Sequence, residues 1–166
     1  MHDHLSSYVQ SRSYRAPEVI LGAKYDYKID MWSLGCILAE MYTGYVLFQN
    51  ESVQGLLARV IGIVGPFPES LVKKCKLASN YFTKEGLIYQ QPPAEEEKSM
   101  SESVNAKKKV QILIPKRTTL KRRMKTDDVN FIDFVKCLLE LDPEKRMSPK
   151  EAMAHPWLTE SKYPEN

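Results

Sequence analysis

The stretch that decides the fold reads YVQSRSYRAPEVILG over residues 8–22 and, after a short turn, KIDMWSLG over residues 28–35. Its first part is predicted to belong to an extended loop over residues 1 to about 25, because Pro17 biases the preceding residue toward β or polyproline geometry and Gly22 permits a turn. Its second part begins a helix over about residues 28–42, with apolar side chains in every direction around the axis. A helix of that kind is expected in the middle of a hydrophobic core.

Four short motifs follow one another along the chain. Ala-Pro-Glu occupies residues 16–18, Asp-x-Trp-Ser-x-Gly residues 30–35, Asp-Pro-Glu-Lys-Arg residues 142–146, and His-Pro-Trp-Leu residues 155–158. Together they resemble the part of a protein kinase that runs from the end of the activation segment to the last helix. Residues 8–15 narrow the resemblance to the dual-specificity tyrosine-regulated (DYRK) kinases of the CMGC group. The resemblance implies a mainly α-helical fold, the C-terminal lobe of a kinase domain.

The motifs that bind ATP and transfer its phosphate are absent from the sequence. It contains no Gly-x-Gly-x-x-Gly, no Val-Ala-Ile-Lys-like strand, no His-Arg-Asp and no Asp-Phe-Gly, which residues 133–135 (Asp-Phe-Val) only mimic. Kinases need a lysine on the phosphates, Mg²⁺ held by an Asp and an Asn, and a catalytic Asp at the substrate hydroxyl. The resemblance thus implies Mg-ATP as cofactor of a longer parent kinase. For this chain alone we expect no cofactor and no catalytic residue, so that it should not phosphorylate any substrate.

Composition bounds the function in other ways. The 166 residues suit one domain, and the net charge of +3 is too small to imply a nucleic-acid partner. Cys36, Cys75 and Cys137 are widely spaced without a Cys-x-x-Cys pattern, which predicts a reduced intracellular protein of the cytoplasm or nucleus. No apolar run approaches the ~20 residues of a membrane span, and no signal peptide is recognisable. Without such a span we expect no membrane partner. The histidines form no metal-binding pattern, so we also expect no metal.

Local patterns predict the remaining elements. Apolar residues at helical spacing indicate a helix over about residues 52–64, and another from Asp128 to a stop at residues 142–143. Residues 86–89 and 110–114 are candidates for two short strands. The last helix begins at Ser148, where Ser-Pro-x-Glu forms a capping box with proline at the first helical position.

The kinase resemblance divides the chain into five segments. Residues 1–25 would form the activation segment and substrate-binding loop, 26–65 the central helices, 66–127 a CMGC-type insert, 128–158 the C-terminal helices and 159–166 a tail.

Tyr8, Arg12 and Arg15 form the sharpest functional hypothesis. A phosphotyrosine carries about −1.5 to −2 charges, and two guanidinium groups on the same loop can clamp it and order the segment. Spacing alone favours a surface tyrosine with two solvated arginines. The DYRK resemblance reverses that preference, since it implies that Tyr8 is a regulatory site phosphorylated by the kinase itself and held by Arg12 and Arg15.

Ser11, Ser13 and Tyr14 are the expected substrate-positioning residues. The resemblance implies that this loop accepts the residue after the phosphorylated Ser or Thr of a protein substrate, often proline. The alternative is that Ser13 and Tyr14 pack the loop on Trp32, and the two roles are compatible.

Several residues are expected to be structural. The resemblance implies that Glu18 and Arg146, far apart in sequence, form a buried ion pair that holds the activation segment to the last helices. From sequence alone, Glu18 would be read as an exposed loop acid. Asp30 of the central helix would accept hydrogen bonds from a catalytic loop that this chain lacks, or would simply favour the helix N-terminus. Trp32 and Gly35 complete the structural set.

Two functions of different classes remain open. The first is the substrate-binding and regulatory half of a Ser/Thr and Tyr kinase, paired with a missing N-terminal lobe. The second is a non-catalytic interaction module that uses the same surface. A basic run at residues 107–125 is interpreted either as a patch for nuclear import or acidic partners, or as a solvated face of the insert opposite the acidic run at residues 95–97.

Overall fold

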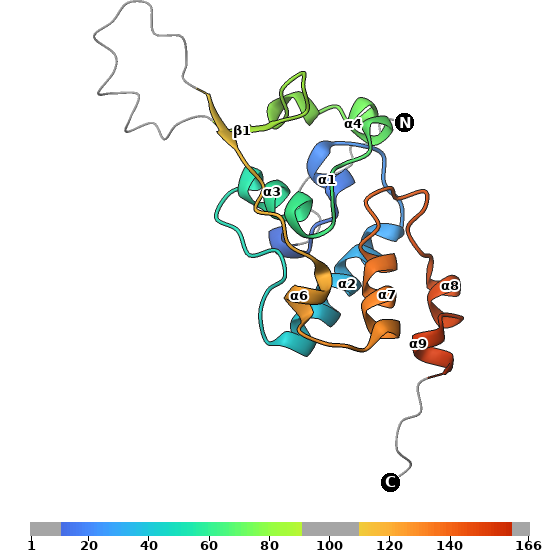
Figure 1. The fold of residues 1–166 in the computed structure, drawn as a ribbon. Coiled ribbons are helices and arrows are strands. Elements are labelled where there is room, and N and C mark those ends of the chain that lie inside the picture. Colours follow the sequence, from blue (N-terminus) through green and yellow to red (C-terminus); the bar gives the residue numbers. More distant parts are fainter. Residues whose placement is uncertain (1–10, 91–109, 161–166) are drawn as a thin grey trace, which may run out of the picture.

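Helices make up most of the computed structural model, which describes residues 11–90 and 110–160 (Figure 1). The expected mainly α-helical fold with a short β-hairpin is confirmed. The elements in chain order are η1 (Arg12–Tyr14), α1 (Pro17–Leu21), α2 (Lys28–Thr43), α3 (Val53–Ile63), α4 (Glu69–Lys74), η2 (Ala78–Asn80), β1 (Ile88–Gln90), β2 (Gln111–Leu113), α6 (Leu120–Met124), α7 (Val129–Leu138), α8 (Pro149–Met153) and α9 (Pro156–Thr159).

The core forms around α2, which packs along α7. Gly35 allows this close approach, because a Cβ atom there would lie 2.9 Å from Leu139 Cδ2 and 3.0 Å from Leu138 Cβ. The helix ends at Gly44, whose φ of 75° lies in the left-handed region that favours glycine. The side chains that α2 contributes to the two core clusters are Ile29, Met31, Trp32, Cys36 and Ala39.

One face of α2 departs from the expectation of burial all round. Asp30, Leu34, Ile37 and Met41 follow one another at three- and four-residue spacing, and all four are exposed. Met41 reaches 78% exposure. Within residues 11–90 and 110–160, no segment covers this stripe, so the buried-type composition of α2 meets its partners on the other face only.

The expectation of an extended loop through residue 25 is wrong at α1. Pro17 stands at the first position of this helix, where its missing N–H costs nothing. All five residues of α1 are buried, because Val19, Ile20 and Leu21 supply enough apolar surface to order the segment against the core. Gly22 closes the helix with φ 73°, as the predicted turn requires.

The C-terminal helices differ in length from the expectation. The helix α7 ends at Leu138 rather than at residue 142, and the buried residues Leu139 and Leu141 continue the core outside it. The capping box of Ser148 and Glu151 is confirmed. The last helix is split, however, because Pro156 opens a new one, α9. Nowhere in the described ranges is a helix both long enough and apolar enough to span a membrane.

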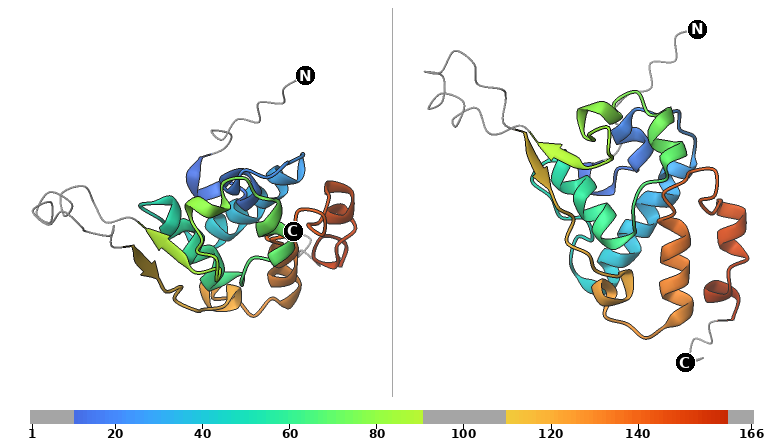
Figure 2. Two further views of the ribbon diagram at one scale, coloured as in Figure 1. Left: turned by 90° about the horizontal axis from the view of Figure 1, so that it is seen from above. Right: turned by 45° about the horizontal axis from the view of Figure 1, so that its top comes forward.

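The hairpin lies at the edge of the helical body (Figure 2). Its strands pair antiparallel, with Ile88 opposite Leu113 and Tyr89 opposite Ile112, close to the predicted strand positions. The chain after β2 is fixed on α3, where the Thr118 N–H donates to the Gly62 carbonyl at 2.8 Å. This crossing needs Gly62, since a Cβ atom there would lie 2.5 Å from the Lys116 carbonyl oxygen.

We expect Gly62→Ala to lower the free energy of unfolding by about 1–3 kcal/mol, because the methyl group meets backbone and the two segments must move apart. Chemical denaturation followed by circular dichroism measures the change. Gly55→Ala on the same helix is the control, since its methyl group would meet only the Ser52 hydroxyl, at 3.2 Å. Equal stability of the two variants would contradict the close crossing.

Candidate functional site

A buried ion pair connects Glu18 of α1 with Arg146 in the loop after α7. Arg146 Nη1 donates to Glu18 Oε1 at 2.6 Å and Nη2 donates to Oε2 at 2.9 Å, in a bidentate arrangement. Both side chains are 0% exposed. A charged pair with this geometry is among the strongest side-chain contacts in a protein. The structure therefore brings together the two residues that the sequence placed 128 positions apart.

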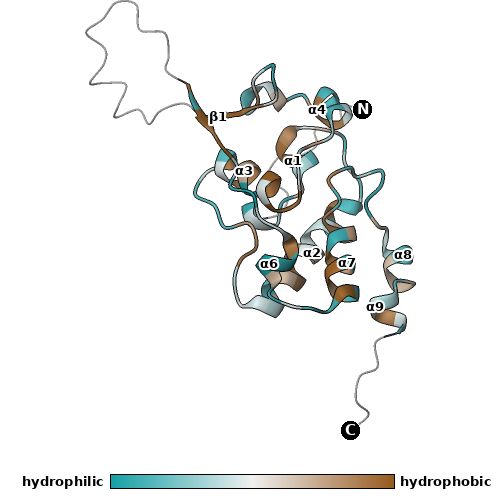
Figure 3. Ribbon diagram, viewed as in Figure 1, coloured by the Kyte–Doolittle hydropathy of each residue, from teal (hydrophilic) through white to brown (hydrophobic). Residues whose placement is uncertain are grey.

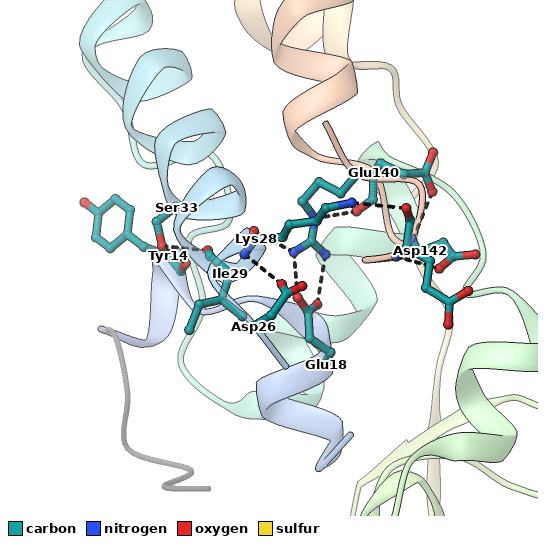
Figure 4. Close-up of polar contacts among 10 residues, drawn as sticks. Tyr14, Glu18, Asp26, Lys28, Ile29, Ser33, Glu140 and Asp142 are labelled. Carbon is teal, nitrogen blue, oxygen red and sulfur yellow. Dashed lines mark hydrogen bonds and ion pairs between the residues drawn. The ribbon is translucent and has the colours of Figure 1, made fainter. Parts of the chain in front are cut away.

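Two further guanidinium protons donate to backbone carbonyls. Arg146 Nη1 donates to the Lys28 carbonyl at 3.0 Å, and Nε donates to the Glu140 carbonyl at 2.8 Å. Figure 4 shows Glu18, Lys28 and Glu140 converging on this point from three parts of the chain. The guanidinium carbon also lies 5.3 Å from the centre of the Trp32 ring. One side chain thus joins α1, the start of α2 and the loop after α7.

The segment before α1 is held against α2 by two hydrogen bonds of Tyr14. The Ser33 hydroxyl donates to the Tyr14 carbonyl at 2.8 Å, and the Tyr14 hydroxyl donates to Glu40 Oε2 at 2.6 Å (Figure 4 shows the first). The bond to the Glu40 carboxylate and, to a lesser extent, burial raise the pKa of Tyr14 above its usual value. Tyr14 stays protonated as a donor, which anchors the segment.

The other candidate residues of this segment are more open. Ser11 and Arg12 are exposed, Ser13 and Arg15 are half-buried, and Ser13 Oγ accepts from Asn50 Nδ2 at 3.3 Å. Arg12 Nη1 donates to the Glu51 carbonyl at 3.3 Å. Tyr8 lies outside the described residues, so the geometry of the expected phosphate clamp is not part of this structure.

Trp32 and Asp30 lie on different faces of α2. Trp32 is 1% exposed and stacks on Phe48, with ring centres 5.5 Å apart and an angle of 12° between the rings. Asp30 sits in the first turn of α2 on the exposed stripe. Its carboxylate therefore remains in contact with water, which avoids the cost of a buried charge.

Asp133, Cys137 and His155 bring three potential metal ligands within 4.8 Å of one another. His155 Nδ1 accepts the Trp157 N–H at 3.1 Å, which assigns the ring proton to Nε2, the atom 3.4 Å from Asp133 Oδ2. Burial and the Asp133 charge raise the pKa of the Cys137 thiol, which favours its protonated form. The group is best described as the cap of α9.

Burial also raises the pKa of the other two thiols, Cys36 and Cys75, and that of Cys75 reaches about 11. All three cysteines are free in the structure.

A cavity of about 570 Å³ lies between the end of α3, the start of α6 and the end of α7. Its walls are mainly apolar, with Lys121, Lys136 and Glu140 among the lining residues. None of the candidate residues of the sequence lines this cavity, so it is separate from the segment around Tyr14.

Sequence reasoning missed several partners of the site. Glu40 and Asn50, which hold Tyr14 and Ser13, carried no motif, although Glu40 is an acid in an otherwise apolar half of α2. The carbonyls of Lys28 and Glu140 could not have been found, because every residue type offers a carbonyl and only the fold selects these two.

The sequence was compared with models of known protein families. The family model described as the protein kinase domain matches residues 1–158. The chain therefore belongs to the protein kinase family.

Its relatives specify the branch of that family. The DYRK-family kinase pom1 of Schizosaccharomyces pombe is 41% identical over 92% of this chain and 13% of its own length. The dual specificity tyrosine-phosphorylation-regulated kinase 4 of Homo sapiens is 36% identical over 97% of the chain and 28% of its own length. The kinase mbk-2 of Caenorhabditis elegans is 40% identical, over 92% of the chain and 19% of its own. The chain is thus similar to DYRK-family kinases and spans less than a third of the length of these relatives.

Proposed function

We propose that this chain is the substrate-facing C-terminal lobe of a dual-specificity DYRK-type kinase domain. The whole protein would transfer the γ-phosphate of Mg-ATP to Ser or Thr of protein substrates, and to its own Tyr8. The observation that supports this most directly is the anchoring of residues 11–18, which carry the DYRK resemblance, by the Glu18–Arg146 pair and by Tyr14. A rigid support for this segment is what a substrate platform requires.

We assign separate roles within the segment. Ser11, Ser13 and Tyr14 position the substrate residue after the phosphorylated one, and a proline is the expected choice. Arg12 and Arg15 clamp the phosphate of Tyr8. The contact of Arg12 with the Glu51 carbonyl is exposed and 3.3 Å long, so a phosphate could displace it at little cost.

The chemistry is proposed to come from the N-terminal half of the kinase domain. The sequence has no ATP-binding or catalytic motif, and the exposed apolar stripe of Leu34, Ile37 and Met41 offers that half a surface to cover. Residues 66–127 would be the insert between the central and last helices. The proposal places the protein inside the cell, in cytoplasm or nucleus, without a nucleic-acid or membrane partner.

The chain alone is expected to incorporate no phosphate from Mg-ATP and to show no change in melting temperature with it. A ligand that binds only the folded state at about 100 times its Kd would stabilise the protein by about 2.7 kcal/mol. A saturable upward shift in melting temperature would therefore contradict the missing nucleotide site.

A chimeric kinase tests the proposed function by its activity. Residues 11–160 replace the matching segment of the human kinase 4, and activity is measured on a Ser-Pro peptide. The chimera should be active, and an Arg12→Ala, Arg15→Ala variant should lose activity while Arg59→Ala, an exposed control on α3, keeps it. A folded but inactive chimera would overturn the proposed function, in favour of a non-catalytic interaction module.

A further inference from the structure

The strand β2 is the edge of its sheet, whereas β1 is covered on both sides. On the side of β1 away from β2, the Tyr89 N–H donates to the Tyr81 carbonyl at 3.0 Å, and the Thr83 N–H donates to the Leu87 carbonyl at 2.8 Å. Within residues 11–90 and 110–160, no strand pairs with the outer side of β2. The hairpin thus presents one open edge.

The register identifies which backbone groups this edge offers. Residues opposite one another in an antiparallel pair alternate between hydrogen-bonded and non-hydrogen-bonded positions. The Tyr89 N–H points away from β2, toward Tyr81, so Tyr89 and Ile112 form a non-hydrogen-bonded pair. The N–H and carbonyl of Ile112 therefore point outward, where an added strand would meet them.

The outer face of the hairpin is apolar. Ile88 and Leu113 share the inner face and pack on the core, so the alternating residues Tyr89 and Ile112 lie on the outer one. The exposed fraction is 42% for Ile112 and rises to 88% for Ile114. Figure 3 shows the hydrophobic colour of the hairpin at this edge. Natural edge strands are usually protected by a charge or a proline within the strand, and residues 110–114 contain neither.

Positive charge follows the open edge directly. From Val110 to Lys125 the sequence contains no acid and six basic residues. The first two of these six after β2 are Lys116 and Arg117. Both are exposed and without an acidic partner among the residues that the structure describes. The crossing over Gly62 fixes this part of the chain on α3, so the two charges keep a constant position beside the strand.

We propose that β2 is a docking edge for an extended acidic segment of a partner protein. The segment pairs with Ile112, places apolar side chains at alternate positions over the outer face, and sets acidic residues beside Lys116 and Arg117. In an antiparallel pairing, the commoner arrangement, the acids precede the apolar residues in the partner sequence. This site does not depend on the proposed kinase function, because it is formed by residues 111–117 and uses none of residues 11–18.

A phage-displayed library of random peptides, each about 12 residues long, is the probe for the 166-residue chain, since strand addition needs only a few paired residues. Selected peptides should carry acids followed by alternating β-branched or aromatic residues. The tightest one, fluorescein-labelled, should lose at least about tenfold in affinity with Lys116→Glu, Arg117→Glu, and again between about 50 and about 500 mM salt. The equally charged variant Lys136→Glu, Lys150→Glu is the matched control and should bind normally.

Backbone pairing is tested separately from charge. The peptide has two alternate sets of residues, and only one set points its N–H groups at the strand. N-methylation of that set should abolish binding, and N-methylation of the other set should preserve it. Bound peptide should also slow hydrogen exchange at the Ile112 amide. The proposal would be overturned by selected peptides that still bind after methylation of either set of residues, or whose affinity is the same for the variant Lys116→Glu, Arg117→Glu. It would also be overturned by an Ile112 amide already protected in the free chain and exposed when Glu95, Glu96 and Glu97 are replaced by serine, since the chain would then cover its own edge.

Discussion

Arg146→Ala is expected to lower the free energy of unfolding by about 3–5 kcal/mol, because it leaves the Glu18 carboxylate buried without its partner. Glu18 is 0% exposed, and both its oxygens accept from this guanidinium. The carbonyls of Lys28 and Glu140 lose a donor as well. Chemical denaturation followed by circular dichroism measures the loss. A domain near the lower end of the usual range of about 5–15 kcal/mol would be close to unfolding.

Two further variants separate the buried charge from the loss of a side chain. Lys145→Ala removes a neighbouring cation that is itself 73% exposed and lies 3.5 Å from Asp142, so stability should change by about 0.5 kcal/mol or less. The double variant Glu18→Met, Arg146→Met removes both charges and is expected to be more stable than Arg146→Ala, because no charge remains uncompensated. If the single and double variants had equal stability, the ion pair would not be the cause.

Much of the fold was predictable because its signals are local. The capping box at Ser148, the left-handed turns at Gly22 and Gly44, and the helical periodicity of α3 depend on residues within one turn of one another. The errors arose where long-range packing decides. The helix α1 exists because its five residues are buried by the rest of the core, and the stripe of α2 is exposed because no described segment covers it.

The candidate site was predictable in a different way. Neither Glu18 nor Arg146 has a local pattern that pairs it with the other, and the expectation came from the order of motifs in a kinase. The partners supplied by backbone, such as the Glu140 carbonyl, and by unmarked side chains, such as Glu40, depend on three-dimensional placement that no motif encodes. Sequence motifs thus identified Glu18 and Arg146, and the structure supplied the backbone carbonyls and the Glu40 side chain that complete the contacts of the site.

The same groups explain how residues 11–13 are kept in place although they are not buried. Residues 11–13 have few buried contacts, yet the segment is fixed at its end by Tyr14 on α2 and by Glu18 on Arg146. Arg146 in turn rests against Trp32, and Trp32 against Phe48. Changes in the core under this chain of contacts should therefore reach the exposed loop.

Trp32→Ala is the second large effect that we expect, a loss of about 3–5 kcal/mol in unfolding free energy from the cavity alone. The ring is 1% exposed and stacks on Phe48, and its contact with the Arg146 guanidinium adds a cation–π interaction of about 0.5–2 kcal/mol. The conservative variant Trp32→Phe keeps an aromatic face and should lose less than half as much. Circular dichroism rather than fluorescence measures both, since Trp32 is itself a fluorophore.

A local measurement tests whether the effect reaches residues 11–15. Under conditions where Trp32→Ala is still mainly folded, trypsin should cleave after Arg12 and Arg15 faster than in the unchanged chain, because Arg146 loses its support and Glu18 is held less firmly. Combining Trp32→Ala with Arg146→Ala should cost less than the sum of the two, since the variants share one contact. Additive losses, or unchanged cleavage after Arg12 and Arg15, would show that Trp32 supports the core without positioning the loop.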